Sequence, residues 1–138
     1  MSSRSDVVEE NITIPAEIKY VREISSKILK KLESRKVGES ALFDIRLCVE
    51  ETLCNAIKHG NKADKGSKVK IRYRIGDGLF TVDIEDSGPG FNPEEVPDPT
   101  REENITKGSG RGVYLVRRLM DKVEYNDKGN RVKLTKRI

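Results

Sequence analysis

Three short segments of this chain combine residue types that could hold a metal ion and an anionic ligand. Glu51 and Asn55 lie four residues apart in a stretch of helical periodicity, so a carboxylate and an amide stand one turn apart. Asp86 ends a strand-like stretch, and Gly108-Ser-Gly-Arg-Gly112 opens a later helical one. Carboxylate and amide oxygens suit a hard cation such as Mg²⁺, while glycines at a helix N-terminus let phosphates approach its amides. Together, the three segments predict a nucleotide site.

The segment with Glu51 and Asn55 is expected on one edge of an amphipathic helix. The core stripe of this helix comprises Ile45, Val49, Thr52, Leu53 and Ala56. At about 100° per residue, Glu51 and Asn55 lie about 40° apart beside that stripe. Glu50 lies about 140° from Asn55 and is expected to be a surface charge. Spacing alone does not distinguish a ligand-binding pair from two ordinary exposed side chains.

Asp86 admits two interpretations. Phe80, Val82 and Ile84 share one face of a strand, and a carboxylate at the next position of that face would be buried, which is costly unless it is hydrogen-bonded. Such a carboxylate could accept a hydrogen bond from a purine amine, with Gly88 and Gly90 letting a flat ring approach the backbone. Alternatively, the strand ends earlier and Asp86 is a turn residue. The residues alone leave both interpretations open.

The glycines at 108, 110 and 112 are a weak signal when taken alone. They follow a long loop rather than a strand, so they match neither a Rossmann fingerprint nor a Walker loop. They are candidates for a binding site because they stand at the start of a helix, where exposed backbone amides attract anions.

The elements that must position these residues follow from apolar periodicity. The expected strands are Val7–Ile14, Lys68–Ile75, Leu79–Glu85, Lys122–Tyr125 and Arg131–Thr135. The expected helices are Ala16–Leu32, a second from a cap at Ser40 to His59 and a terminal Gly60, and Gly112–Met120 with Leu115, Val116 and Leu119 inward. The stretch from Gly88 to Lys107 is expected to be a long functional loop. This order predicts one α+β domain over residues 1–138, a two-layer α/β sandwich with helices on one face of a mixed, mostly antiparallel sheet.

Composition narrows the function classes. The chain has 138 residues, a net charge of +4 and 36% charged residues. It contains no run near the ~20 apolar residues that span a bilayer and no apolar core of a signal peptide, so we expect a cytoplasmic protein without membrane contact. The basic residues of one strand alternate with apolar ones and only 5% of residues are aromatic, which disfavours nucleic-acid binding. Cys48 and Cys54, six residues apart on one helix, are expected to be reduced packing residues.

In this order and spacing, the motifs resemble the boxes of the GHKL ATPase superfamily, which has the Bergerat ATP-binding fold. Glu51-Thr-Leu-Cys-Asn55-Ala-Ile-Lys-His59-Gly60 resembles the N box, Asp86-Ser-Gly-Pro-Gly90 the G1 box and Gly108-Ser-Gly-Arg-Gly112 the G2 box. The segments Gly110-Arg-Gly-Val-Tyr-Leu-Val-Arg-Arg-Leu-Met-Asp121 and Leu134-Thr-Lys136 are similar to those of bacterial anti-sigma-factor serine/threonine-protein kinases. The resemblance covers nearly the whole chain and implies a histidine-kinase-like ATPase domain.

The resemblance also implies roles for individual residues, with ATP and Mg²⁺ as cofactors. Glu51 would be the general base, Asn55 would bind Mg²⁺, and Asp86 would hold the adenine amine in a pocket shaped by Gly88 and Gly90. The positions implied to contact phosphates are Lys107, Gly108, Gly110, Arg111 and Gly112. The family often has Gly-Thr before its last strand, with the threonine near adenine. In this chain Gly129-Asn130 stands at that place, so the family's threonine is replaced by an asparagine.

The implied function is that of a protein serine kinase in a partner-switching pathway. Its substrate would be a serine of a STAS-domain anti-anti-sigma protein, and it would sequester a sigma factor or another effector. Arg22 matches a position of partner contact, and dimerisation is common among such kinases. The alternative is a non-catalytic nucleotide-binding switch or sequestering module of the same fold. A base beside the metal position argues against that alternative.

Overall fold

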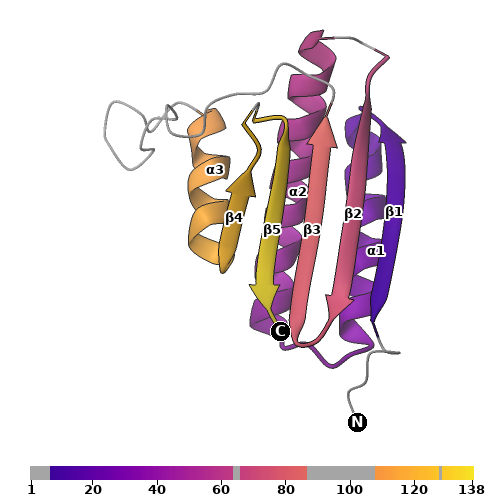
Figure 1. The fold of residues 1–138 in the computed structure, drawn as a ribbon, viewed down its shortest axis with the longest axis vertical. Coiled ribbons are helices and arrows are strands. Elements are labelled where there is room, and N and C mark those ends of the chain that lie inside the picture. Colours follow the sequence, from indigo (N-terminus) through magenta and orange to yellow (C-terminus); the bar gives the residue numbers. More distant parts are fainter. Residues whose placement is uncertain (1–6, 64–65, 87–107, 128) are drawn as a thin grey trace.

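The structure, a computed structural model, describes residues 7–63, 66–86, 108–127 and 129–138, with the backbone alone for 59–63 and 108–111. Its strands are β1 (Val8–Pro15), β2 (Lys68–Gly76), β3 (Leu79–Asp86), β4 (Lys122–Tyr125) and β5 (Arg131–Arg137). Its α-helices are α1 (Val21–Glu33), α2 (Glu39–Ala63) and α3 (Gly108–Leu119), with a short 3₁₀ turn at Ile18–Tyr20 (Figure 1). The predicted loop Gly88–Lys107 lies outside the described residues.

The described strands form one five-stranded sheet in the order β1-β2-β3-β5-β4. The predicted α+β architecture is confirmed, but the sheet is more regular than the mixed sheet that the sequence suggested, since every neighbouring pair of described strands is antiparallel. The reason lies in the path of the chain after β3. Helix α3 returns the chain so that β4 runs in the same direction as β3, but β5 lies between them and runs the opposite way (Figure 1).

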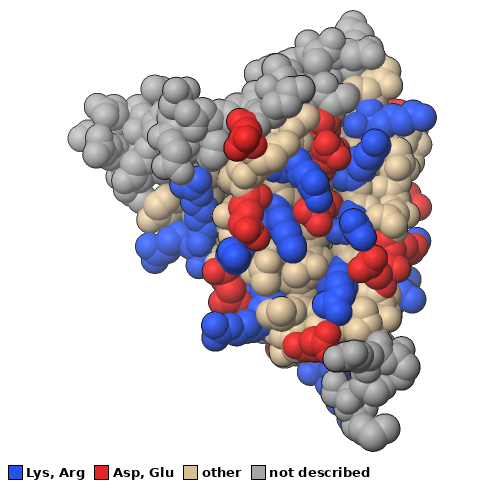
Figure 2. All heavy atoms as spheres, viewed as in Figure 1, with Lys and Arg blue, Asp and Glu red and all other residues tan. Residues whose placement is uncertain are grey.

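The helices pack on one face of the sheet and leave the other face open (Figure 1). Strict alternation in β2 and β3 buries one set of side chains against α1 and α2, namely Val69, Ile71, Tyr73, Ile75, Phe80, Val82 and Ile84. Ile28 and Leu32 of α1 and Leu53 of α2 close this core from the helical side. The open face carries Lys, Arg, Asp and Glu side chains across the strands (Figure 2), as the sequence predicted.

Two predicted helix starts are corrected by local hydrogen bonds. The expected helix Ala16–Leu32 begins later, because the Ala16 amide donates to the Ser67 carbonyl at 3.0 Å and keeps this residue tied to the sheet edge. Ser40 does not cap α2, since the Leu42 amide already donates to Gly38 at 3.0 Å. Ser40 therefore lies inside the first turn.

The prediction that α2 ends at Gly60 is also wrong. The helix continues through Gly60 to Ala63. A glycine inside a helix costs only about 1 kcal/mol relative to alanine, which the rest of a 25-residue helix can offset.

Among the described residues, no helix is long and apolar enough to cross a bilayer.

Helix α3 begins four residues earlier than predicted and turns a different side inward. Val113, Val116 and Met120 are buried, whereas Leu115 is 40% exposed and Leu119 is partly buried. With Val116 at the centre of the buried face, Val113 and Met120 lie about 60° and 40° away, but Leu115 lies about 100° away. The expectation that Leu115 points inward is therefore wrong.

Candidate functional site

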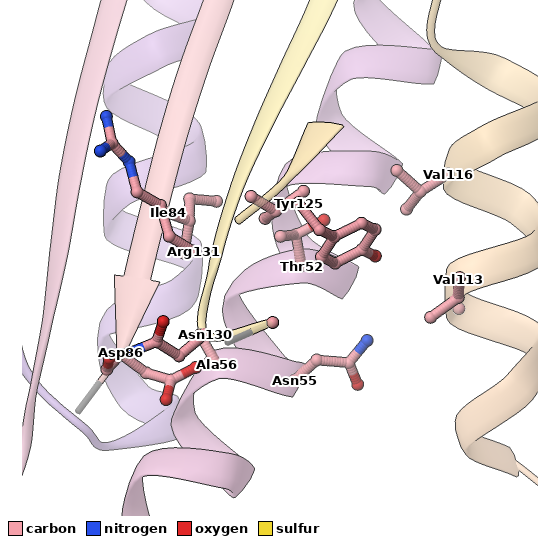
Figure 3. A pocket seen from close by; sticks show the side chains of 13 residues that line it. Thr52, Asn55, Ala56, Ile84, Asp86, Val113, Val116, Tyr125, Asn130 and Arg131 are labelled. Atoms are coloured by element: carbon pink, nitrogen blue, oxygen red, sulfur yellow. Dashed lines mark hydrogen bonds between the residues drawn. The ribbon is translucent and has the colours of Figure 1, made fainter. Parts of the chain in front are cut away.

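A pocket, partly open to solvent, lies where β3 ends and β5 begins, between the sheet and helices α2 and α3 (Figure 3). Its lining residues are Thr52, Asn55, Ala56, Ile84, Asp86, Gly112, Val113, Val116, Tyr125, Gly129, Asn130, Arg131 and Val132. One member of each predicted motif, Asn55, Asp86 and Gly112, is among them. The three motifs therefore meet at one place in the fold.

Asp86 is buried, with 6% of its surface exposed, and is the last residue of β3. It pairs with Val69 of β2 and follows the inward parity of Ile84. Its amide donates to the Asn130 carbonyl at 2.9 Å. Of the two interpretations left open by the sequence, the buried strand position is confirmed. The structure thus places a carboxylate in the lining of the pocket.

Asn55 extends from α2 on the side of the pocket formed by α3 (Figure 3). The core stripe predicted for this helix is confirmed, with Val49, Thr52, Leu53 and Ala56 buried. Asn55 stands beside that stripe and is only half-buried. An amide oxygen in this position can bind a ligand while the helix keeps its packing against the sheet.

Glu51 lies directly against the backbone of α3. A Cβ atom added at Gly112 would lie 2.7 Å from Cδ and 2.9 Å from Oε1 of Glu51. Helices α2 and α3 run antiparallel (Figure 1). One turn along α2, from Glu51 to Asn55, therefore leads in the same direction as one turn back along α3, from Gly112 to its first residue, Gly108. The carboxylate, the amide and the first turn of α3 therefore line up along the two helices.

Gly112 has a role that the sequence did not reveal. The resemblance assigned it to phosphate contact, and in the structure its lack of a side chain also leaves room for the end of the Glu51 side chain, which a Cβ atom would displace. A signal was available, because a glycine inside a helix is disfavoured by about 1 kcal/mol relative to alanine and often has a packing reason.

The remaining predicted positions are only partly covered by the described residues. Gly88, Gly90 and Lys107 lie outside them. Gly108, Gly110 and Arg111 form the first turn of α3, whose backbone alone is described. Arg22 is exposed in the first turn of α1 and does not line the pocket.

Glu50 is more than the surface charge that the sequence suggested. It accepts a hydrogen bond from the buried Ser25 hydroxyl at 2.6 Å, and Arg46 lies 3.5 Å away. Its angular offset from Asn55 places it toward α1, away from the pocket. Glu50 and Glu51 are thus neighbouring carboxylates on different sides of α2.

The cysteines behave as predicted. Both thiols are free, and burial raises the pKa of Cys48 to about 12 and also raises that of Cys54. A raised pKa keeps both thiols protonated and unreactive near neutral pH.

Tyr125 and Asn130 are among the lining residues that were not predicted as site residues. Tyr125 lines the pocket half-buried, and burial raises the pKa of its phenol. Asn130 lines it as well, and its side-chain amide donates to the Asp86 carbonyl at 3.1 Å. The sequence placed both at the ends of the last predicted hairpin, and the family resemblance set Asn130 where a threonine near adenine is often found.

Residues 14–136 match the family model described as the histidine kinase-like ATPase domain. Curated relatives include the serine-protein kinase RsbW of Bacillus subtilis, which is 27% identical and aligns over 99% of this chain and 88% of its own length. RsbW of Listeria monocytogenes is 28% identical over 92% of this chain and 85% of the relative. RsbW of Staphylococcus aureus is 27% identical over 100% and 91%, respectively.

A solved structure has the same fold. The RsbU and RsbW domains of Rv1364c from Mycobacterium tuberculosis align with a TM-score of 0.61 and 22% identity, over 94% of this chain and 32% of the larger one. The resemblance stated from the three motifs is therefore confirmed. With nearly its whole length matched and its three motifs gathered around one pocket, the chain belongs to the histidine kinase-like ATPase domain family.

Proposed function

We propose that this chain is an ATP-dependent protein serine kinase that acts as an anti-sigma factor or a similar partner-switching regulator. It transfers the γ-phosphoryl group of ATP to a serine of a STAS-domain antagonist protein. The observation that carries the proposal is the meeting of Asp86 and Asn55 in one pocket with Glu51 packed beside it. The name serine-protein kinase, which the relatives bear, supports the same reaction.

The nucleotide lies with its base at the strand side of the pocket and its phosphates toward α3. Asp86 accepts a hydrogen bond from the exocyclic amine of adenine, and a charged acceptor makes such a bond strong. Gly88 and Gly90, outside the described residues, are the glycines that the family resemblance implies near the ring. The phosphates are bound at the start of α3 by Lys107, Gly108, Gly110, Arg111 and Gly112, where free amides and the helix dipole favour negative charge.

The residues present suit Mg²⁺ as the metal. Within the described part of the chain, no three His, Cys, Asp or Glu side chains gather into a metal cluster. Mg²⁺ fits a site with few protein ligands, because it keeps several of its waters and binds the phosphates as well. Asn55 would hold the ion through its amide oxygen. When bound, Mg²⁺ neutralises charge on the phosphates.

Glu51 acts as the general base. It accepts the proton of the substrate serine hydroxyl while that oxygen forms a bond to the γ-phosphorus, and the bond to the bridging oxygen breaks to release ADP. Its place one turn from Asn55 puts the base next to the phosphate end of the nucleotide. Phosphoryl transfer depends mostly on positioning and charge neutralisation, so this small set of groups suffices.

The regulatory part of the proposal concerns partners. The kinase sequesters a sigma factor or another effector and releases it when its antagonist is unphosphorylated. The exposed Arg22 on α1 is a contact for such partners. The protein works in the cytoplasm, as one domain that can pair with a second copy, and binds neither nucleic acid nor membrane.

The test follows the intact mass of STAS-domain proteins of the host after mixing with the kinase and Mg·ATP. We expect one protein to gain a single phosphoryl group. Glu51→Gln should slow the transfer by roughly 10²- to 10⁴-fold, the usual contribution of a general base, with ATP binding retained. Glu50→Gln is the matched control, because this neighbouring carboxylate faces Ser25 instead of the pocket.

Each contrary outcome has a distinct meaning. Failure of the wild-type chain to bind ATP would refute the site. Undiminished transfer by Glu51→Gln would refute the assignment of Glu51 as the general base. ATP binding without transfer to any STAS protein would favour the non-catalytic switch.

A further inference from the structure

The pairing of β3 with β5 continues one residue past the regular ladder, at the rim of the pocket. The last regular pair is Glu85 with Arg131. Beyond it, the Asp86 amide donates to the Asn130 carbonyl at 2.9 Å. In a regular antiparallel pair, the Asn130 amide would return a bond to the Asp86 carbonyl. It does not do so here.

A side chain takes the place of that missing backbone bond. The Asn130 amide N–H donates instead to Oδ1 of Asn126 at 3.1 Å, because the chain turns here toward β4. The Asn130 side-chain Nδ2 then donates to the Asp86 carbonyl at 3.1 Å. Both backbone groups of Asp86 are therefore held by the same residue.

Asn126 in turn holds the side chain of Asn130. Its Nδ2 donates to Oδ1 of Asn130 at 2.8 Å, while its Oδ1 also accepts from the Arg131 amide at 3.1 Å. The Gly129 amide donates to the Asn126 carbonyl at 3.1 Å, and Gly129 has φ of 74°, a conformation that favours glycine. Each asparagine donates and accepts at once, which a primary amide can do and a carboxylate cannot.

We propose that Asn130, oriented by Asn126, is a positioning residue that fixes the direction of the Asp86 carboxylate and thereby selects a purine with an exocyclic amine. The inference rests on the proposed function, in which Asp86 binds that amine. Asp86 is the last residue of its strand, so the two bonds from Asn130 fix the backbone from which its carboxylate projects into the pocket. Asn130 acts through Asp86 and need not touch the nucleotide.

The experiment compares two nucleotides that differ only in the amine. Dissociation constants of ATP and purine riboside triphosphate are measured with Mg²⁺ by calorimetry on the full chain. A hydrogen bond to a charged group contributes about 1.5–3 kcal/mol, so the wild type should prefer ATP by roughly 10- to 150-fold. Asn130→Ala should reduce that preference to about threefold or less, with the affinity for the analogue changed by less than about twofold.

Two further variants keep the test independent of simple misfolding. Asn126→Asp retains the acceptor for two backbone amides but loses the donor to Asn130, so it should reduce the preference for ATP without opening the turn. The double variant with Asn130→Ala should be no worse than Asn130→Ala alone, because the two residues act in series. Asn11→Ala, on the open face of β1, is the control and should leave the preference unchanged.

The outcomes separate this inference from the proposed function. Absence of ATP binding by the wild type would overturn the function. A wild type that binds ATP but does not discriminate against the analogue would overturn the inference alone. An equal loss of affinity for both nucleotides in the Asn130 and Asn126 variants would show a merely structural role and would also overturn it.

Discussion

The two ends of the pocket are built in different ways. The strand end, comprising Asp86, Gly129 and Asn130, is held by hydrogen bonds of 2.9 and 3.1 Å between backbone and amide groups. The helix end has Asn55 and Gly112 in the lining and Glu51 beside them, and it is held by close packing of the Glu51 carboxylate on Gly112. The first arrangement continues a sheet, and the second is an interface between two helices.

This difference assigns a separate role to each end within the proposed function, namely the choice of ligand to the strand end and the rate of transfer to the helix end. A strand register is fixed, because a slip by one residue would move Asp86 to the opposite face of the sheet. The strand end is therefore suited to deciding which ligand binds. At the helix end, the long Glu51 side chain takes its position from its neighbour on α3, so this end is suited to controlling the rate of transfer.

Asp86→Asn should give the largest change at the strand end. The carboxylate and its charge-assisted hydrogen bond are lost, and ATP affinity should fall by roughly 10- to 150-fold, equivalent to about 1.5–3 kcal/mol. Transfer at saturating ATP should change little, since Glu51 and Asn55 stay in place. Titration calorimetry and single-turnover transfer measure the two effects separately.

Asp83→Asn is the matched control, because Asp83 lies on the open face of the same strand beside Arg131. If both variants bind ATP as the wild type does, the strand end does not recognise the base. If Asp86→Asn instead slows transfer at saturating ATP, the two ends are not independent.

Gly112→Ala should act at the helix end, where we expect the rate of transfer to change and the ATP affinity to stay nearly the same. The new methyl group would overlap the end of the Glu51 side chain, and this flexible group can move, so the fold should tolerate the change. A gain in helix propensity of about 1 kcal/mol offsets much of the overpacking. A displaced base is costly for catalysis, and we expect transfer to slow by about tenfold while ATP affinity changes less than about threefold.

Gly38→Ala provides the comparison, since a Cβ atom there meets nothing within 4 Å. Transfer at the wild-type rate by Gly112→Ala would mean that the position of Glu51 against α3 is irrelevant to the reaction. A large loss of ATP affinity would instead assign Gly112 chiefly to phosphate contact.

The sequence predicted the parts of this molecule that depend on local periodicity. The alternation in β2 and β3 placed their buried faces correctly, and the β4–β5 hairpin was also predicted. Asp86 remained ambiguous, because its burial depends on pairing with Val69 and Asn130, and periodicity within one strand cannot show that pairing. Leu115 was misplaced for a similar reason, since α2 and the sheet determine which side of α3 faces inward.

The contacts that the sequence could not predict join segments that are distant along the chain. Asn130 and Asp86 are separated by 44 residues along the chain. Gly112 faces Glu51 from another helix, and Glu50 meets Ser25 of α1. Each of these contacts needs the arrangement of whole elements, which spacing within one segment does not provide.

Lys136 anchors the end of α3 to β5 and gives the smallest expected effect. It occupies an inward position of the strand, where Val132 and Leu134 are apolar, and its side chain is only 17% exposed. Its Nζ donates to the carbonyl of Leu119 at 2.7 Å, and Asp44 of α2 lies 3.4 Å away. The cation therefore ties the last turn of α3 to the sheet, where the helix dipole also favours positive charge.

Lys136→Met keeps the apolar stem but removes the charge and its donors. Loss of this charged hydrogen bond should lower the free energy of unfolding by about 1–2 kcal/mol, measured by urea denaturation. Lys133→Met, on the exposed face of the same strand, should change it by less than about 0.5 kcal/mol. Because the tie acts on α3, transfer should slow slightly while the preference for ATP over purine riboside triphosphate stays at its wild-type value. Equal stability of the two variants would mean that apolar packing alone anchors α3, and a changed nucleotide preference would mean that the helix end and the strand end are coupled through β5.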